Sequence, residues 1–180
     1  MYLILDSLVR IMAPILSFTA DEIWRHVPEY KGKESNVHLA EMALPKQEWK
    51  DETVETRWLK VLEVRAEVTK ALEAARTAKL IGHPLDASVR IKLPDDEYKE
   101  SFKGLDEDLR DIFIVSNASV KDEVQQGAFT SNEIKGLSVE VNRAEGTKCE
   151  RCWKFDANIG DNPEHPTACP RCAETLESIL

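Results

Sequence analysis

Two Cys-x2-Cys turns stand close together in residues 149–172, which read CERCWKFDANIGDNPEHPTACPRC. Sixteen residues separate the turns, a spacing within the zinc-ribbon range of about 15–20 residues. Each turn lets two thiolates converge on one ion, and two turns supply the tetrahedral four-sulfur set that suits Zn²⁺. The spacing therefore predicts one structural zinc ion held by Cys149, Cys152, Cys169 and Cys172.

Other uses of these cysteines stay open at the level of sequence. The four cysteines could instead form two disulfides or a redox dithiol, or they could be unrelated free thiols. A four-sulfur site also accepts iron. All four cysteines lie within the last 32 residues, which favours a local site over a disulfide framework spread along the chain. His165 lies between the pairs, but four cysteines fill a structural site, so we interpret His165 as a solvated loop residue.

Basic and aromatic residues surround the cysteines. Arg151 lies inside the first turn, Trp153 and Lys154 follow it, and Arg171 lies inside the second turn. An exposed arginine beside a tryptophan suits a stacked nucleobase, a contact typically of about 1–3 kcal/mol per base. The alternative is that Trp153 covers the metal site while Arg151 is solvated.

The composition supports a folded core and excludes several classes of protein. Of 180 residues, 42% are hydrophobic and 32% charged, and no run approaches the roughly 20 apolar residues of a membrane-spanning helix. The chain does not open with the basic segment of a signal peptide, so we expect a cytoplasmic location. The formal net charge of −9 argues against a general polyanion binder, and any nucleic-acid binding would come from local patches.

The first 82 residues are predicted to be mainly helical. Apolar residues recur at helical spacing from Leu3 to Leu16, and Pro14 ends or kinks this helix. No cap residue precedes Tyr2, so we expect the sequence to begin inside a helix. The exposed apolar face of that helix is then expected to be covered by neighbours or to self-associate.

Two further helices are predicted in this part. Thr19 and Glu22 match a capping box for a helix that ends before Pro28, with a hydrophobic staple formed by Phe18 and Ile23. A long helix is predicted over 51–80, terminated by Gly82 and Pro84. Its apolar stripe consists of Val54, Trp58, Val61, Val68, Leu72 and Ala75.

The pattern then changes to short strands. Alternating residues predict strands over 87–93 and 137–141, and an apolar run predicts another over 112–115, extending toward 120. A short helix is expected over 105–111, a loop over 122–136, and an extended segment over 37–44. We expect an α+β chain with a helical part (1–82), a small mixed α/β segment (83–144) and a zinc-ribbon-like module (145–180).

Catalytic constellations are missing from the sequence. It contains neither a Gly-rich phosphate loop nor a Gly-x-Ser-x-Gly elbow. His26, His38 and His83 stand in helix-terminating or isolated positions, where structural roles explain them. We therefore assign no catalytic residue.

Three stretches resemble a known family. Residues 8–24 (LVRIMAPILSFTADEIW) and 74–87 (AARTAKLIGHPLDA) resemble the anticodon-binding helical domain of the class I synthetases for isoleucine, valine and leucine. The motifs CERCW (149–153) and CPRC (169–172) resemble the zinc module that closes bacterial isoleucyl-tRNA synthetases. The order of these parts covers nearly the whole chain.

The resemblance implies a function that the residues alone do not establish. It implies the C-terminal part of a monomeric cytoplasmic ligase that joins isoleucine to its tRNA with ATP. The catalytic and editing domains of that family have no counterpart here, so this chain alone is expected to be inactive, and ATP would bind only to the full-length enzyme. The partner implied is the tRNA for isoleucine. Arg151 and Trp153 become candidates for base contact, and Lys154 and Arg171 for phosphate contact.

Two other functions remain as alternatives. Formamidopyrimidine-DNA glycosylases close with a similar zinc module, but a β-rich acidic segment precedes the cysteines here where those enzymes carry DNA-binding helices. A zinc ribbon that binds another protein would be consistent with the negative charge.

Overall fold

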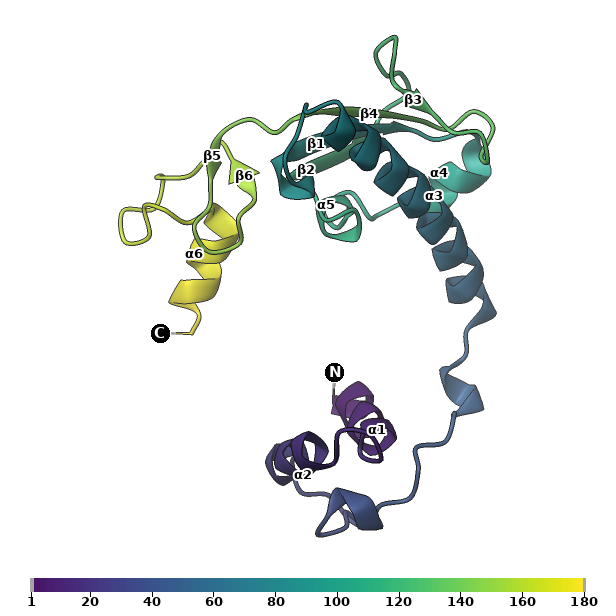
Figure 1. Ribbon diagram of the computed structural model, residues 1–180, viewed down its shortest axis with the longest axis vertical. Coiled ribbons are helices and arrows are strands. Elements are labelled where there is room, and N and C mark those ends of the chain that lie inside the picture. The colour runs from purple at the N-terminus through teal and green to yellow at the C-terminus, as the bar shows by residue number, and fades with distance from the viewer. Residues whose placement is uncertain (1, 180) are drawn as a thin grey trace. The chain divides into compact units, whose positions relative to one another are not determined.

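The computed structural model describes residues 2–179 (Figure 1). These residues form two compact units, and the boundary along the chain lies between Asp51 and Glu52. Each unit is described by itself. The fold is α+β, as predicted. Among the described residues, no helix combines the length and apolar character needed to cross a membrane.

The first unit is a small helical cluster. It contains α1 (Tyr2–Met12), α2 (Ser17–His26) and the 3-10 turns η1 (Val37–Leu39) and η2 (Gln47–Trp49). The core consists of Val9, Ala13, Ala20, Trp24, Val27 and Val37. The indole of Trp24 is completed by a hydrogen bond, because its Nε1–H donates to the Glu34 carbonyl oxygen at 2.7 Å.

The start of α2 differs from the prediction. Leu16 is the N-cap and makes no side-chain cap hydrogen bond, so no capping box forms at Thr19. The backbone N–H of Ala20 already donates to the Leu16 carbonyl, which places Thr19 inside the first turn. Phe18 is 93% exposed and staples nothing. The expected extended segment over 37–44 is wrong for its first three residues, which form η1, whereas Ala40 has extended dihedral angles.

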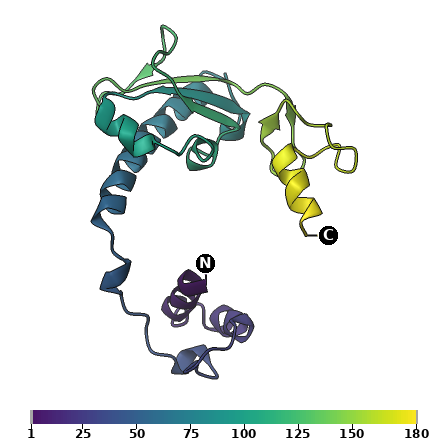
Figure 2. The same ribbon diagram turned by 180° about the vertical axis from the view of Figure 1, so that it is seen from behind.

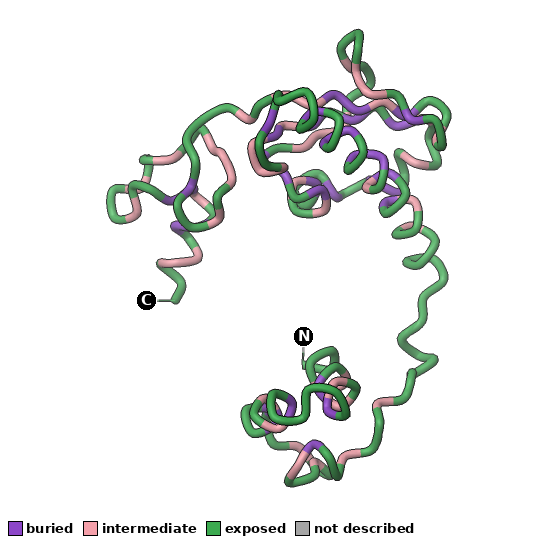
Figure 3. The backbone as a smooth tube through the Cα atoms, viewed as in Figure 1, coloured by how far each residue is buried: buried purple, intermediate pink, exposed green. Residues whose placement is uncertain are grey.

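The long helix α3 (Glu52–Thr77) belongs to the second unit, not with α1 and α2. It lies across one face of a sheet, and only the turns over that face are buried (Figures 2 and 3). The buried residues are Val61, Val64, Glu67, Val68, Ala71, Leu72 and Ala75. Val54 and Trp58 were expected on the buried stripe but are exposed, because they precede the turns that reach the core.

The helix α3 ends earlier than predicted. Lys79 takes the left-handed conformation at φ 59°, and the Leu80 N–H donates back to the Ala75 carbonyl at 3.0 Å. This is a Schellman-type end with lysine in the place that glycine usually takes. Gly82 therefore does not terminate α3; its N–H donates instead to Asp86, in the 3-10 turn η3 (Pro84–Asp86).

The sheet has the strand order β2-β1-β4-β3, with β1 parallel to β2 and antiparallel to β4. The strands are β1 (Ala87–Lys92), β2 (Asn117–Val120), β3 (Phe129–Thr130) and β4 (Ser138–Arg143). The predicted strands over 87–93 and 137–141 are thus confirmed. Val89 and Ile91 of β1 pair with Val141 and Val139 of β4, and the first two are fully buried.

The crossover from β1 to β2 holds α4 (Asp96–Phe102) and α5 (Leu109–Ile112). The helix α4 was not predicted, although Asp95 caps it by accepting from the Tyr98 N–H at 3.0 Å. The predicted strand is wrong over 112–115, because Ile112 ends α5 and Ile114 has φ 57°. Its apolar residue Phe113 reaches the core from a helical turn instead. The predicted extension toward residue 120 is confirmed, because β2 covers Asn117–Val120.

Residues beyond β4 form a small cysteine-centred module. A hairpin of β5 (Thr147–Lys148) and β6 (Phe155–Asp156) precedes α6 (Pro170–Glu177). Its buried residues are Cys149, Ala168, Cys169, Cys172 and Ala173. Because so little apolar surface is buried, this module depends on its cysteines for a stable structure.

Candidate metal centre

The four predicted cysteine ligands come together in the structure. The four sulfur atoms all lie within 4.8 Å of one another, and they belong to Cys149, Cys152, Cys169 and Cys172. The Cys152 and Cys169 sulfurs are 3.8 Å apart. A tetrahedral site with zinc–sulfur bonds of about 2.3 Å has sulfurs about 3.8 Å apart, so the donor set fits one Zn²⁺. The same distance is far longer than a disulfide bond.

The first knuckle is built on the β5–β6 hairpin. The Cys149 N–H donates to the Lys154 carbonyl, and the Trp153 N–H donates to the Cys149 carbonyl, both at 2.9 Å. This tight turn holds Trp153 in the left-handed region at φ 65°. Gly146, just before the hairpin, has φ 96°, and a Cβ there would lie 2.4 Å from the Asp156 backbone. The sequence analysis did not single out this glycine, although the hairpin requires it.

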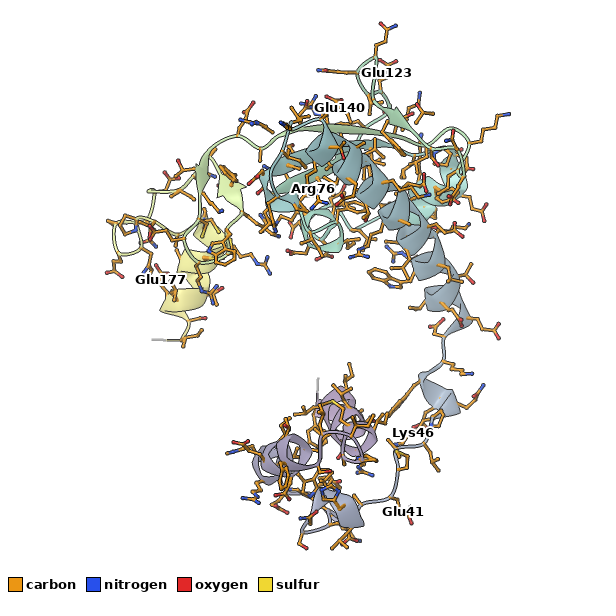
Figure 4. All side chains as sticks on the ribbon, in the orientation of Figure 1. Glu41, Lys46, Arg76, Glu123, Glu140 and Glu177 are labelled. Atoms are coloured by element: carbon orange, nitrogen blue, oxygen red, sulfur yellow. The ribbon has the colours of Figure 1, made fainter. Side chains whose placement is uncertain are left out.

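The second knuckle opens the helix α6. Cys169 is the N-cap and Pro170 takes the first turn, where the missing N–H of proline leaves no hydrogen bond unmade. The Cys169 N–H donates to the Cys149 sulfur at 3.3 Å, which joins the two knuckles. The loop between them is tied to α6, because the Asn162 amide donates to the Glu177 carboxylate at 2.7 Å. Figure 4 labels Glu177 on α6.

The thiols have unequal acidities. Burial alone would raise the pKa of the Cys149 thiol, but backbone N–H groups of Cys152, Cys169 and Arg151 outweigh it and lower that pKa to about 6. Burial raises the pKa of Cys169 to about 12 and raises that of Cys152 as well. Arg151 donates to the Cys172 sulfur at 3.5 Å, which offsets the negative charge of a four-thiolate set.

The structure leaves His165 outside the sulfur cluster. The group of potential ligands among residues 2–179 contains the four cysteines and no histidine. The His165 backbone N–H donates to the Asn162 side chain at 3.2 Å, within the loop between the knuckles. This agrees with the interpretation of His165 as a loop residue.

Trp153 is an exposed residue of the module. The residue is 61% exposed, and the Lys148 ammonium lies 5.9 Å from its ring centre. Lys148 was not predicted as part of the site, and only the hairpin pairing brings it beside Trp153. Together they present an aromatic face with a neighbouring positive charge.

Lys154 and Arg171 meet at one carboxylate. Both form ion pairs with Asp111 of α5, the Arg171 pair at 3.0 Å. The Lys154 side chain is 14% exposed, whereas that of Arg171 is 62% exposed. Of these two predicted phosphate contacts, Arg171 therefore has the larger surface open to a ligand.

Sequence comparison relates both ends of the chain to known families. The family described as the anticodon-binding domain of tRNA ligase matches residues 1–91. The chain belongs to this family. A second family, described as a zinc finger found in FPG and IleRS, matches residues 146–175 and so covers all four cysteines.

Individual relatives of this family member are isoleucine–tRNA ligases. The chain is 45% identical over 179 residues to that of Geobacter sulfurreducens and 44% identical over 182 residues to that of Desulfitobacterium hafniense strain DCB-2. These matches cover 98% and 99% of the chain, but 19% of each relative. The chain thus spans about a fifth of the length of these relatives.

The two family matches separate the alternatives. The zinc finger alone is found in both classes of protein named in its description. The anticodon-binding match over 1–91 and the relatives favour the ligase and disfavour the glycosylase. The zinc-finger match and the sulfur geometry together support one structural Zn²⁺.

Proposed function

We propose that this chain binds the anticodon arm of the tRNA for isoleucine, as the C-terminal part of an isoleucine–tRNA ligase in the cytoplasm. The observation that carries the proposal is the presence of an anticodon-binding domain and a four-cysteine zinc finger in one chain. Because the catalytic motifs are missing from this chain, ligation with ATP is proposed only for the whole enzyme. The whole enzyme is also proposed to be a monomer.

The metal is proposed to act by shaping the binding surface. Cys149, Cys152, Cys169 and Cys172 would hold Zn²⁺, which cross-links the two knuckles and supplies no catalytic chemistry. A preformed knuckle binds more tightly than a flexible one, because less ordering entropy is lost on binding. Zinc would therefore contribute to RNA affinity through rigidity.

Individual contacts are assigned from exposure and chemistry. Trp153 offers its exposed ring to a base, and Arg151 beside it offers hydrogen bonds and charge. Arg171 is the better placed phosphate contact. Lys154 is proposed to contribute less, because its side chain is largely buried whereas that of Arg171 is exposed.

Binding to RNA tests the proposal. We expect the zinc-loaded chain to bind an isoleucine anticodon stem-loop, measured by fluorescence anisotropy, with affinity that falls as salt increases. A stem-loop with a scrambled anticodon is the matched control and should bind more weakly. Preference for an abasic DNA duplex, or equal binding of both stem-loops, would contradict the proposal.

We also propose that α1 is a contact surface. Leu3, Ile4, Leu8 and Ile11 are exposed and, with Trp49, line an apolar hollow within the first unit. Exposed apolar patches of this kind tend to find partners. Sedimentation of the isolated chain is expected to show concentration-dependent association, and a strictly monomeric chain would contradict this.

A further inference from the structure

A single carboxylate joins both metal knuckles to the sheet region. Lys154 lies two residues after Cys152 of the first knuckle, and Arg171 lies inside the second. Both side chains form ion pairs with Asp111, which lies on α5 in the β1–β2 crossover. The Asp111 carboxylate therefore contacts each half of the cysteine module.

A buried serine makes a second connection. The Phe155 N–H of β6 donates to the Ser116 hydroxyl oxygen at 2.6 Å, and that hydroxyl donates to the Leu85 carbonyl. Ser116 is 1% exposed. The Ser116 hydroxyl thus donates one hydrogen bond and accepts another, and each broken bond would leave a backbone group unpaired.

Covalent linkage alone does not orient the module. Arg143 ends β4, and only residues 144–146 lead from it to β5. The Ala144 N–H still donates to the Asp86 carbonyl at 2.8 Å, so the segment free to rotate is short. With only one contact, the module could still rotate relative to the sheet about this segment. The two contacts at Asp111 and Ser116 together restrict that rotation.

The charges at this joint favour the docked arrangement. Burial raises the pKa of Asp111, but the positive charges of Lys154, Arg171 and Arg110 lower it by more than burial raises it. The carboxylate therefore stays ionised near neutral pH. Lys154 is largely covered, which marks its ion pair as part of the packing between the two parts.

We propose that Asp111 and Ser116 are positioning residues that hold the zinc module in one orientation, so that Trp153 and Arg151 meet RNA as a preset surface. Neither residue needs to touch the RNA. The RNA part of this inference rests on the proposed function, whereas the docking part does not.

Nuclear magnetic resonance of the zinc-loaded full chain tests the docking. Amide ¹⁵N relaxation gives separate rotational correlation times for residues 145–179 and for the sheet. We expect one shared value in the unmodified chain. In the double variant Asp111→Ala/Ser116→Ala we expect a shorter value for the module, with zinc content unchanged.

Matched variants control for general damage. Asp122 pairs with Lys99 at 3.5 Å, and Ser101 is a buried serine whose hydroxyl donates to the Glu97 carbonyl within α4. The double variant Asp122→Ala/Ser101→Ala should leave the shared correlation time intact. Asp111→Asn removes only the charge of a half-exposed side chain, so it should disturb folding little. If the double variant does not fold, this variant tests the contact between the zinc module and α5.

RNA binding gives the second readout. We expect the double variant to bind the anticodon stem-loop roughly tenfold more weakly, because the module must then be oriented during binding. The salt dependence should not change, because no phosphate contact is removed.

Three outcomes overturn all or part of the inference. An unchanged correlation time in the Asp111 variants overturns the docking part. Tighter RNA binding by Asp111→Asn would mean that Asp111 masks Lys154 and Arg171, which overturns the positioning role. If the unmodified chain binds no RNA while the module still loosens in the variants, the proposed function fails and the docking part stands.

Discussion

Trp153 has a backbone conformation that burial does not explain. A bulky residue at positive φ costs about 1–2 kcal/mol, and Trp153 is 61% exposed, so burial returns little. Strain held at an exposed aromatic residue is a reason to look for a ligand.

Replacing Trp153 separates a binding role from a packing role. In Trp153→Gly the relief of backbone strain offsets the flexibility of glycine, so we expect module stability to stay within about 1 kcal/mol. Affinity for the anticodon stem-loop should fall roughly tenfold or more, since one base stack is lost. Trp153→Phe retains a stacking ring and should lose less. Unchanged RNA affinity in Trp153→Gly would return Trp153 to a structural role.

Glu67 links the α3 helix to the loop before β4. Its buried carboxylate lies 2.6 Å from the Lys70 ammonium, and hydrogen bonds from Lys70 and Ser131 lower its pKa despite burial. A carboxyl group with a lowered folded-state pKa stabilises the protein above its unfolded pKa. This contribution is lost as pH falls through the lowered folded value.

The pH profile of unfolding tests this assignment. We expect the free energy of unfolding to decline as pH drops below the ordinary glutamate value of 4.5, and Glu67→Gln to flatten that decline. Glu55→Gln, at an exposed position of α3, is the control and should keep the steeper profile. Equal profiles for Glu67→Gln and the unmodified chain, measured by denaturant titration, would refute the assignment.

At the scale of elements, the end of α3 offers a test of backbone conformation. Lys79 is the left-handed residue of the Schellman turn, and glycine takes this conformation without steric cost. We therefore expect Lys79→Gly to raise the free energy of unfolding by about 0.5–1 kcal/mol. The same new residue in Ala74→Gly, at a helical position of α3, should lower it by about 1 kcal/mol. Changes of the same sign in both variants would contradict the turn.

The short elements show where neighbours overrule local pattern. The apolar run over 112–115 has the composition of a strand, but Phe113 reaches the core by closing α5. The amphipathic stripe of α3 continues to Val54, yet only the turns over the sheet are buried. Periodicity identifies which residues prefer burial, and the partner element determines which of them achieve it.

At the scale of the whole molecule, metal removal should divide the second unit. The cysteine module buries almost nothing besides its ligands, whereas α3 and the sheet share an extended apolar core. Zinc binding can contribute on the order of 10 kcal/mol to such a module. After chelation we expect amide signals of residues 145–179 to collapse toward unfolded positions. Signals of the sheet should persist, and a fully retained module would contradict a structural role for zinc.

Some of this protein could be derived from residue spacing alone. Ligand spacing predicts that Cys149, Cys152, Cys169 and Cys172 hold one metal ion. Hydrophobic periodicity predicts the long helix α3 and the strands β1 and β4. These patterns involve residues close together in the sequence, so they can be recognised without knowledge of the tertiary structure.

Only the tertiary structure decided how the site is presented. Lys154 and Arg171 lie 43 and 60 positions from Asp111, and Ser116 lies 39 from Phe155; no local pattern connects residues so far apart. The exposure of Trp153 likewise depends on which surfaces surround the hairpin. The metal ligands were therefore readable from sequence, while the carboxylate and hydroxyl that hold the module on the sheet appear only once distant segments pack together.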